Sequence, residues 1–178
     1  MSINQRKFVQ DEYSETAEWQ LVSSIAKSLT DYLSQPLVTK KIDAVNVPGA
    51  SSKEIQDVLL EKALAIGFKD ESKGLFKNYP SKGLRPDFYL PIADGETGII
   101  IEVERGKTNQ NNMDFLDFWK CHICDVAHYL FLFVPNELVQ NSSGKISGHP
   151  FNTVSQHMTP FFEKKNYTNV RGVVVIGF

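Results

Sequence analysis

The stretch GIIIEVERGKT, residues 98–108, decides the fold. Its first residues are apolar and mostly β-branched, which is typical of a buried central strand. Side chains alternate between the two faces of a strand, so Glu102 and Glu104 share one face, and Ile101 and Val103 share the other. Two ionised carboxylates on one face repel each other, which disfavours a core and suits a divalent cation.

The preceding segment LRPDFYLP, residues 84–91, also predicts a strand, and the turn-like ADGET, residues 93–97, separates the two. Asp87 stands 15 residues before Glu102 (102 − 87 = 15), a spacing that allows a hairpin to place them side by side. Because Mg²⁺ prefers oxygen ligands, Asp87, Glu102 and Glu104 together predict a metal site. The alternative is an edge strand with a hydrated acidic face.

Periodicity elsewhere predicts further elements. Helices are expected near residues 12–34, 52–66, 110–126 and 152–165, and other strands near 74–80, 127–135 and 171–178. Ser51 and Glu54 form a capping box before the second helix, and Gly67 is a stop signal. Residues 40–48 suit a short strand or an extended connection, and residues 141–150 suit a loop. This order predicts an α/β sandwich with a central mixed β-sheet flanked by helices.

Length and composition indicate one domain. The 178 residues are 42% apolar and 22% charged, as in ordinary soluble globular proteins. We expect residues 1–50 to form an N-terminal helical extension and residues 51–178 to form the core. No run approaches the roughly 18 apolar residues of a membrane span, and the polar start lacks an apolar signal region. The sequence therefore predicts a cytoplasmic protein.

Charge is unevenly distributed along the chain, whose net charge is −2. Between residues 69 and 85, five basic residues face two acidic ones (5 − 2 = +3): Lys69, Lys73, Lys77, Lys82 and Arg85 against Asp70 and Glu71. Arg105 and Lys107 directly follow the acidic pair. Positive charge beside a carboxylate site suits a polyanion whose phosphate must meet a metal, although a solvated loop would have the same composition.

Pro86-Asp87, a hairpin-length gap and then Glu102-Val103-Glu104 together resemble the motif of the PD-(D/E)XK nuclease superfamily. The element order from residue 51 to about 134, roughly half the chain, is similar to the α-β-β-β-α-β core of that superfamily. The resemblance implies a restriction-endonuclease-like fold and a metal-dependent endonuclease that hydrolyses phosphodiester bonds in DNA, as type II restriction enzymes do. It assigns Asp87 and Glu102 to Mg²⁺ or Mn²⁺.

The third motif position, usually Lys, is Glu104 here, and some type II restriction endonucleases of the superfamily also carry Glu there. Glu104 is expected to bind a second metal ion or to take a proton from the attacking water. Lys107, or Arg105, would then supply the missing positive charge. The superfamily often adds an acid from the helix before the sheet, for which Glu54 and Glu61 are candidates.

The resemblance also implies partners. Lys77, Lys82, Arg85 and Arg105 are the expected nucleic-acid contacts, with DNA as the substrate and RNA not excluded. Cutting both strands of a duplex favours a homodimer, with the 12–34 helix as a candidate interface. Two alternatives remain: a catalytically lapsed nuclease-like module that binds nucleic acid or a protein, and a structural α/β protein with an acidic strand end.

Two other motifs are set aside. Gly106-Lys107-Thr108 imitates the end of a phosphate-binding loop, but Ile101 stands where that pattern requires glycine. Cys121 and Cys124 form a C-x-x-C without a second ligand pair, so they are interpreted as reduced core thiols rather than zinc ligands.

Overall fold

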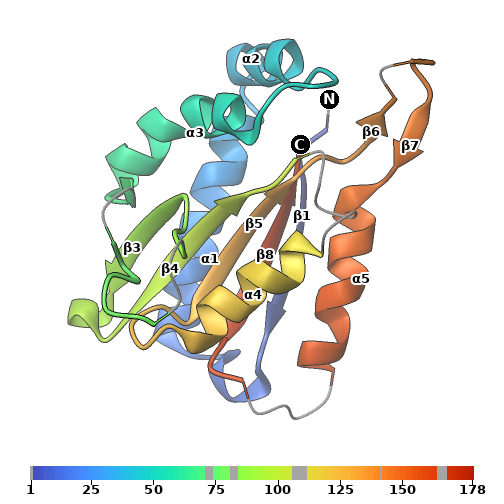
Figure 1. Cartoon of the computed structure of the whole chain (residues 1–178). Coiled ribbons are helices and arrows are strands. Elements are labelled where there is room, and N and C mark those ends of the chain that lie inside the picture. Colours follow the sequence, from blue (N-terminus) through green and yellow to red (C-terminus); the bar gives the residue numbers. More distant parts are fainter. Residues whose placement is uncertain (1, 71–73, 81–83, 106–111, 141, 164–167) are drawn as a thin grey trace.

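The chain folds into one six-stranded mixed sheet with helices on both faces (Figure 1). This computed structural model describes all residues except 1, 71–73, 81–83, 106–111, 141 and 164–167. The strand order is β1-β8-β5-β4-β3-β2, and a separate two-stranded ribbon pairs β6 with β7. The α/β sandwich with a central mixed sheet, as the sequence predicts, is confirmed.

The sheet strands have the following bounds: β1 Asn4–Val9, β2 Lys69–Asp70, β3 Phe88–Ile92, β4 Thr97–Val103, β5 Tyr129–Val134 and β8 Gly172–Gly177. The central pairs β4–β5 and β5–β8 are parallel, and the outer pairs are antiparallel. Strands β5 and β8 are buried along their whole length, which explains their almost uninterrupted apolar sequences.

The β3–β4 hairpin is the element that positions the predicted site. Its turn is a short 3₁₀ segment, η2 Ala93–Gly95, whose residues adopt positive φ. Phe88 pairs with Ile101, and the next position along each strand brings Asp87 beside Glu102. The backbone N–H of Asp87 donates to the Ile101 carbonyl at 3.1 Å, so the ladder extends to this residue.

The two faces of β4 carry different side chains, as the alternation predicts. Ile101 and Val103 are 1% and 2% exposed and belong to the core between the sheet and the first three helices. Ile100 belongs to the core on the opposite face, which is the face that Glu102 and Glu104 share. The strand assignment on which the site depends is therefore confirmed.

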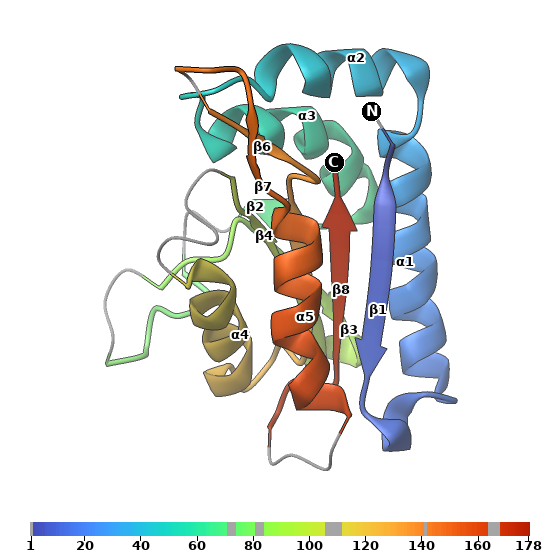
Figure 2. The same ribbon diagram turned by 90° about the vertical axis from the view of Figure 1, so that its right-hand side faces the viewer.

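The helices form two outer layers (Figure 2). One face of the sheet carries α1 Ala17–Leu33, α2 Pro36–Val45 and α3 Ser52–Ile66, and the other carries α4 Met113–Ile123 and α5 Pro150–Phe162. The capping box of Ser51 and Glu54 is present, and Gly67 ends α3 at φ 111°. Within the described residues, no helix has both the length and the apolar character needed to cross a membrane.

The prediction of a strand or extended connection at residues 40–48 is wrong, because most of this segment lies in α2. Pro36 occupies the first turn of that helix, where its missing N–H and fixed φ are tolerated. Val38 and Ile42, four residues apart, are buried on one side. The proline therefore begins a second helix directly after the first.

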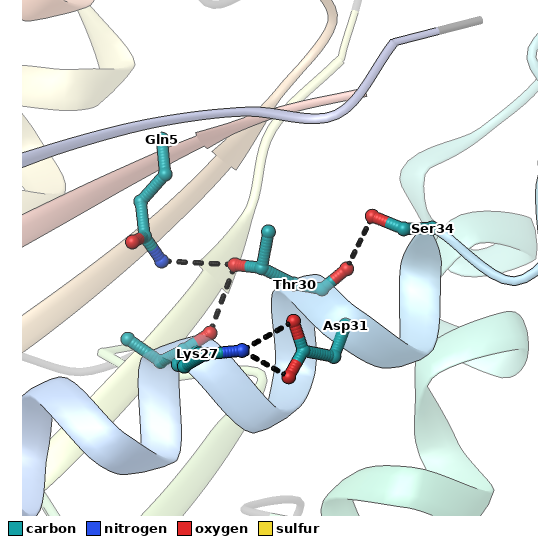
Figure 3. Close-up of polar contacts among 6 residues, drawn as sticks. Gln5, Lys27, Thr30, Asp31 and Ser34 are labelled. Atoms are coloured by element: carbon teal, nitrogen blue, oxygen red, sulfur yellow. Dashed lines mark hydrogen bonds and ion pairs between the residues drawn. The ribbon is translucent and has the colours of Figure 1, made fainter.

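The first strand was missed. β1 pairs with β8 at the edge of the sheet, so the N-terminal region contributes a strand as well as helices. Its NQRKFV sequence lacks apolar alternation, and its exposed polar residues are typical of an edge strand. Gln5 donates to Thr30 Oγ1 at 2.8 Å, tying β1 to α1 beside the exposed Lys27–Asp31 ion pair (Figure 3).

Two further expectations are corrected. Described residues 74–80 form turns rather than a strand, with buried Phe76 packed edge-on against Tyr79 at 5.1 Å. The expected loop at 141–150 contains β7 Ile146–Gly148, which pairs with β6 Leu138–Val139. Both segments are rich in turn-forming residues. Whether such a segment pairs as a short strand therefore depends on contacts that the local sequence does not encode.

Candidate active site

Asp87, Glu102 and Glu104 lie at the end of the β3–β4 hairpin opposite its turn, where β3 begins and β4 ends. Asp87 Oδ2 accepts a hydrogen bond of 2.7 Å from the Val103 backbone N–H, which fixes its carboxylate at the end of β4. Glu102 is 3% exposed, and Glu104 is partly buried. The charge of Asp87 acts on both glutamates, so the three acids form one electrostatic unit.

Helix α4 adds a lysine and an aspartate that the sequence interpretation missed. Lys120 Nζ donates to Glu102 Oε1 at 2.9 Å and lies 2.9 Å from Asp117 Oδ1. Lys120 is 8% exposed and Asp117 is completely buried. A buried ammonium between two buried carboxylates requires a close, specific arrangement, because each charge alone would be expensive to remove from water.

A second buried aspartate of α4, Asp114, connects the site to α5. Its Oδ2 lies 2.6 Å from His157 Nδ1, and the His157 ring stacks on Phe115 with centroids 4.7 Å apart. The charge of Asp114 acts on Glu104 and Asp117. The acidic group therefore extends from the β3–β4 hairpin across α4 to α5.

Burial raises the pKa values of Asp87, Glu102, Glu104 and Asp117, and repulsion between acids adds to the shift in the last three. Burial, followed by the charge of Asp117, raises the pKa of Glu104 to about 7. The same two causes raise the pKa of Glu102 well above its ordinary value. Burial raises the pKa of Asp117 to about 6, although the Lys120 charge opposes the shift. Burial also raises the pKa of Asp87. Burial opposes the charged form of Lys120, but Glu102 and Asp117 outweigh it and raise the pKa of Lys120.

The donor set suits a hard divalent cation. Carboxylate oxygens crowded enough to raise one another's pKa values would be relieved by a nearby positive charge. Among the residues that the structure describes, no three ligand-type side chains lie close enough to form a ready-made metal cage. Mg²⁺ is commonly held by one or two carboxylates, with water and phosphate completing its coordination, so Asp87 and Glu102 are compatible with it.

The wild-type chain should lose stability between about pH 4.5 and pH 7 through Glu104. Its carboxyl binds a proton more tightly when folded, with a pKa of about 7 against 4.5, so the folded state holds more protons in this range. The free energy of unfolding therefore falls as pH rises. Glu104→Gln should not show this loss. The difference in free energy of unfolding between the variant and wild type should shift in favour of the variant by about 1–2 kcal/mol from pH 5 to pH 8, after allowance for partial exposure.

Urea denaturation of both proteins in EDTA at pH 5, 6, 7 and 8 measures this difference. Glu96→Gln is the matched control, because Glu96 is exposed in the turn before β4. The control should follow the wild-type dependence on pH. A Glu104→Gln curve parallel to the wild-type curve would show that Glu104 ionises as freely in the folded chain as in the unfolded one.

The two predicted accessory acids lie elsewhere on α3. Glu54 Oε2 accepts from the Ser51 backbone N–H at 2.6 Å, so it closes the capping box. Glu61 is exposed and faces the groove between α2 and α3. The α3 residue that hydrogen-bonds Asp87 is Gln56. In this structure α3 thus presents an amide, rather than an acid, to the predicted metal ligand.

The expected basic residues differ in their exposure. Lys77 and Arg85 are exposed, whereas Lys82 and Lys107 lie outside the described residues. Arg105 is 8% exposed and donates from Nε to Asn46 Oδ1 at 3.0 Å; it also bonds the Val47 and Ala50 carbonyls. Its guanidinium therefore holds the α2–α3 connection against the end of β4.

A hollow of about 740 Å³ lies beside the hydrogen bonds of Arg105. It lies between the α2–α3 connection and the β6–β7 ribbon, and Arg105, Asn136 and Phe178 are among its lining residues. The lining mixes amide, carboxylate and apolar groups. Arg105 follows the end of β4, so the hollow opens at this end of the strand.

The two cysteines are free and buried, as expected of core thiols. Cys121 Sγ contacts the Ala127 carbonyl at 3.4 Å, and burial raises the pKa of both thiols. A thiol with a raised pKa is a poor nucleophile and a poor metal ligand.

A pattern that could have revealed the α4 contribution was present in the sequence. Asp114, Asp117 and Lys120 follow one another at three-residue spacing, which places them along one face of a helix. The same face carries the buried Phe118 and Cys121. Charged residues repeated on a core-facing helix side are uncommon unless paired, so the spacing itself indicated a buried ionic site.

The comparisons with known proteins find a weak structural similarity and no match to a protein family or to a curated protein. Among solved structures, the chain is similar to restriction endonuclease BglII complexed with a DNA 16-mer, with a TM-score of 0.49 and 16% identity. The match covers 99% of this chain and 76% of that one.

Proposed function

We propose that this protein is a metal-dependent phosphodiesterase that hydrolyses DNA, in the manner of a type II restriction endonuclease. The observation that carries the proposal is the joint burial of Glu102 and Lys120, in contact at 2.9 Å, beside Asp87 and Glu104. This arrangement supplies carboxylates for a cation and an ammonium for a phosphate at one point of the sheet. Lys120 thereby offers the positive charge that position 104 lacks.

The chain's own groups divide the reaction between them. Asp87 and Glu102 would hold Mg²⁺ or Mn²⁺, which lowers the pKa of a bound water and neutralises charge on the phosphate. Glu104, with its pKa raised to about 7, is suited to accept the proton of the attacking water near neutral pH. The Lys120 ammonium would stabilise the negative charge that develops on the phosphate. The Val103 N–H keeps Asp87 in place during these steps.

A second copy of the chain would be needed to cut both strands of a duplex with one site per protomer. The apolar face of α1 packs on the sheet through buried residues such as Val22 and Leu29. A homodimer through α1 would therefore use the outer side of this helix, where Leu21 is 46% exposed. The homodimer stays a prediction.

One observation favours the second candidate function, a catalytically lapsed module that binds nucleic acid or a protein without cleaving DNA. The Lys120 ammonium already neutralises Glu102, so the fold is satisfied without a metal ion at that carboxylate. In this case the acidic group would be a structural ion pair between β4 and α4. The two functions differ in whether any metal-dependent cleavage occurs.

The test is cleavage of supercoiled plasmid, a pool of random-sequence duplexes, and single-stranded RNA at low salt, because phosphate contacts weaken steeply as salt rises. With Mg²⁺ or Mn²⁺ we expect nicked and linear DNA, and with EDTA none. Cleavage that continues in EDTA would contradict the mechanism. Binding of the duplex pool without cleavage under any of these conditions would favour the lapsed module.

A further inference from the structure

The Lys120 ammonium has two carboxylate neighbours at the same distance. Nζ lies 2.9 Å from Glu102 Oε1 and 2.9 Å from Asp117 Oδ1. Both contacts are ion pairs of hydrogen-bond length, and both carboxylates stabilise the charged form of Lys120. The ammonium is therefore shared between Glu102 and Asp117.

Asp117 is a buried carboxylate that pairs with the Lys120 ammonium. It is completely buried, and a buried carboxylate is costly unless it is paired. The other buried aspartate of α4, Asp114, pairs through Oδ2 with His157. The second carboxylate partner of the ammonium is thus Asp117.

The placement of the three residues allows the ammonium to change partner without moving the backbone. Asp117 and Lys120 are three residues apart on α4, so they are neighbours on its surface, and Glu102 faces them from β4. Lysine has a flexible four-carbon stem and three rotatable donors. The ammonium can therefore give up its contact with Glu102 and keep its contact with Asp117 after a small rotation of the side chain.

We propose that Asp117 is a positioning residue that retains the Lys120 ammonium when a divalent cation binds Glu102. The proposal rests on the function proposed above, in which Glu102 is a metal ligand. Without Asp117 the ammonium has Glu102 as its single carboxylate partner and competes with the cation for it. With Asp117 present, Glu102 would be free to serve as a metal ligand while the ammonium stays in the site.

The test is a double-mutant cycle read by calorimetric titration of Mn²⁺ alone into wild type, Asp117→Asn, Lys120→Met and the double variant. We expect Asp117→Asn to weaken Mn²⁺ binding at least about tenfold. In the Lys120→Met background, where no ammonium competes, the same change should alter the affinity less than about threefold. Lys120→Met alone should bind Mn²⁺ at least as tightly as wild type.

Two results would overturn the inference while leaving the proposed function intact. An equal loss in both backgrounds would mean that Asp117 attracts the cation only through its own charge. Unchanged affinity in Asp117→Asn would mean that the ammonium never hinders the metal. If wild type binds no Mn²⁺ at a site that depends on Glu102, the proposed function itself fails, and the inference fails with it.

Thermal melts of all four proteins accompany the titrations, because Asp117 lies in the core. If the asparagine amide prevents folding, Asp117→Leu takes its place in the cycle as an apolar residue of similar shape. The expected dependence on Lys120 is the same for both substitutions. A role confined to packing would give no such dependence.

Discussion

Replacing Glu102 with glutamine should abolish metal-dependent cleavage, with a loss in rate of at least about 10³-fold. Glu102 combines burial, the Lys120 hydrogen bond and proximity to Asp87, and glutamine removes its charge with little change of shape. Initial rates on plasmid in Mg²⁺ and in Mn²⁺ measure the effect. Glu96→Gln, in the exposed turn before the same strand, is the matched control and should cut at the wild-type rate.

Retention of more than about a tenth of the wild-type rate by Glu102→Gln would remove Glu102 from the reaction. Circular dichroism and thermal melts establish that the variant is folded before its rate is interpreted. Because glutamine still accepts a hydrogen bond from Lys120, the link between β4 and α4 should survive the substitution. Loss of cleavage in a folded variant would therefore report on the chemistry.

Lys120→Met should have the second largest effect, because it removes both the ammonium of the reaction and the counter-charge of two buried carboxylates. We expect cleavage to fall about 10²–10³-fold, as when a single transition-state donor is lost. The free energy of unfolding should also fall by about 3–5 kcal/mol at pH 8, the usual cost of breaking a buried ion pair. Cleavage rates and urea denaturation measure the two effects separately.

Lys27→Met is the matched control for this substitution. Lys27 also pairs with an aspartate on its own helix, but both partners are exposed on α1 (Figure 3). Its loss should cost less than about 1 kcal/mol and leave cleavage unchanged. A Lys120→Met protein that cuts like wild type would show that the buried ammonium only holds β4 to α4.

The sequence predicted the parts of the fold that local pattern determines. The apolar run before Glu102 and the capping box at Ser51 identified β4 and α3, because burial and capping are read from neighbouring residues. β1 and α2 were missed or mistaken for a different physical reason. An edge strand with polar side chains becomes a strand by pairing with β8, and Pro36 is compatible with either the end or the start of a helix.

The arrangement of the candidate site could also be predicted only in part. The hairpin spacing was enough to bring Asp87 to Glu102, since antiparallel register follows from a short turn. The contribution of α4 required knowing which helix face meets β4, and 18 residues separate Glu102 from Lys120. Gln56 lies on the predicted helix. Only the way α3 packs on the sheet decides that Gln56, rather than Glu54 or Glu61, hydrogen-bonds Asp87.

The central claim is that Asp87 and Glu102 jointly bind a divalent cation, and calorimetric titration of Mn²⁺ into wild type and Asp87→Asn tests it most directly. Asparagine can still accept the Val103 N–H bond, so the end of β4 should stay in place while one charged ligand is lost. The account predicts one Mn²⁺ site in wild type that is weakened at least about tenfold in Asp87→Asn. Equal Mn²⁺ affinity in both proteins, or no binding to wild type, would contradict it.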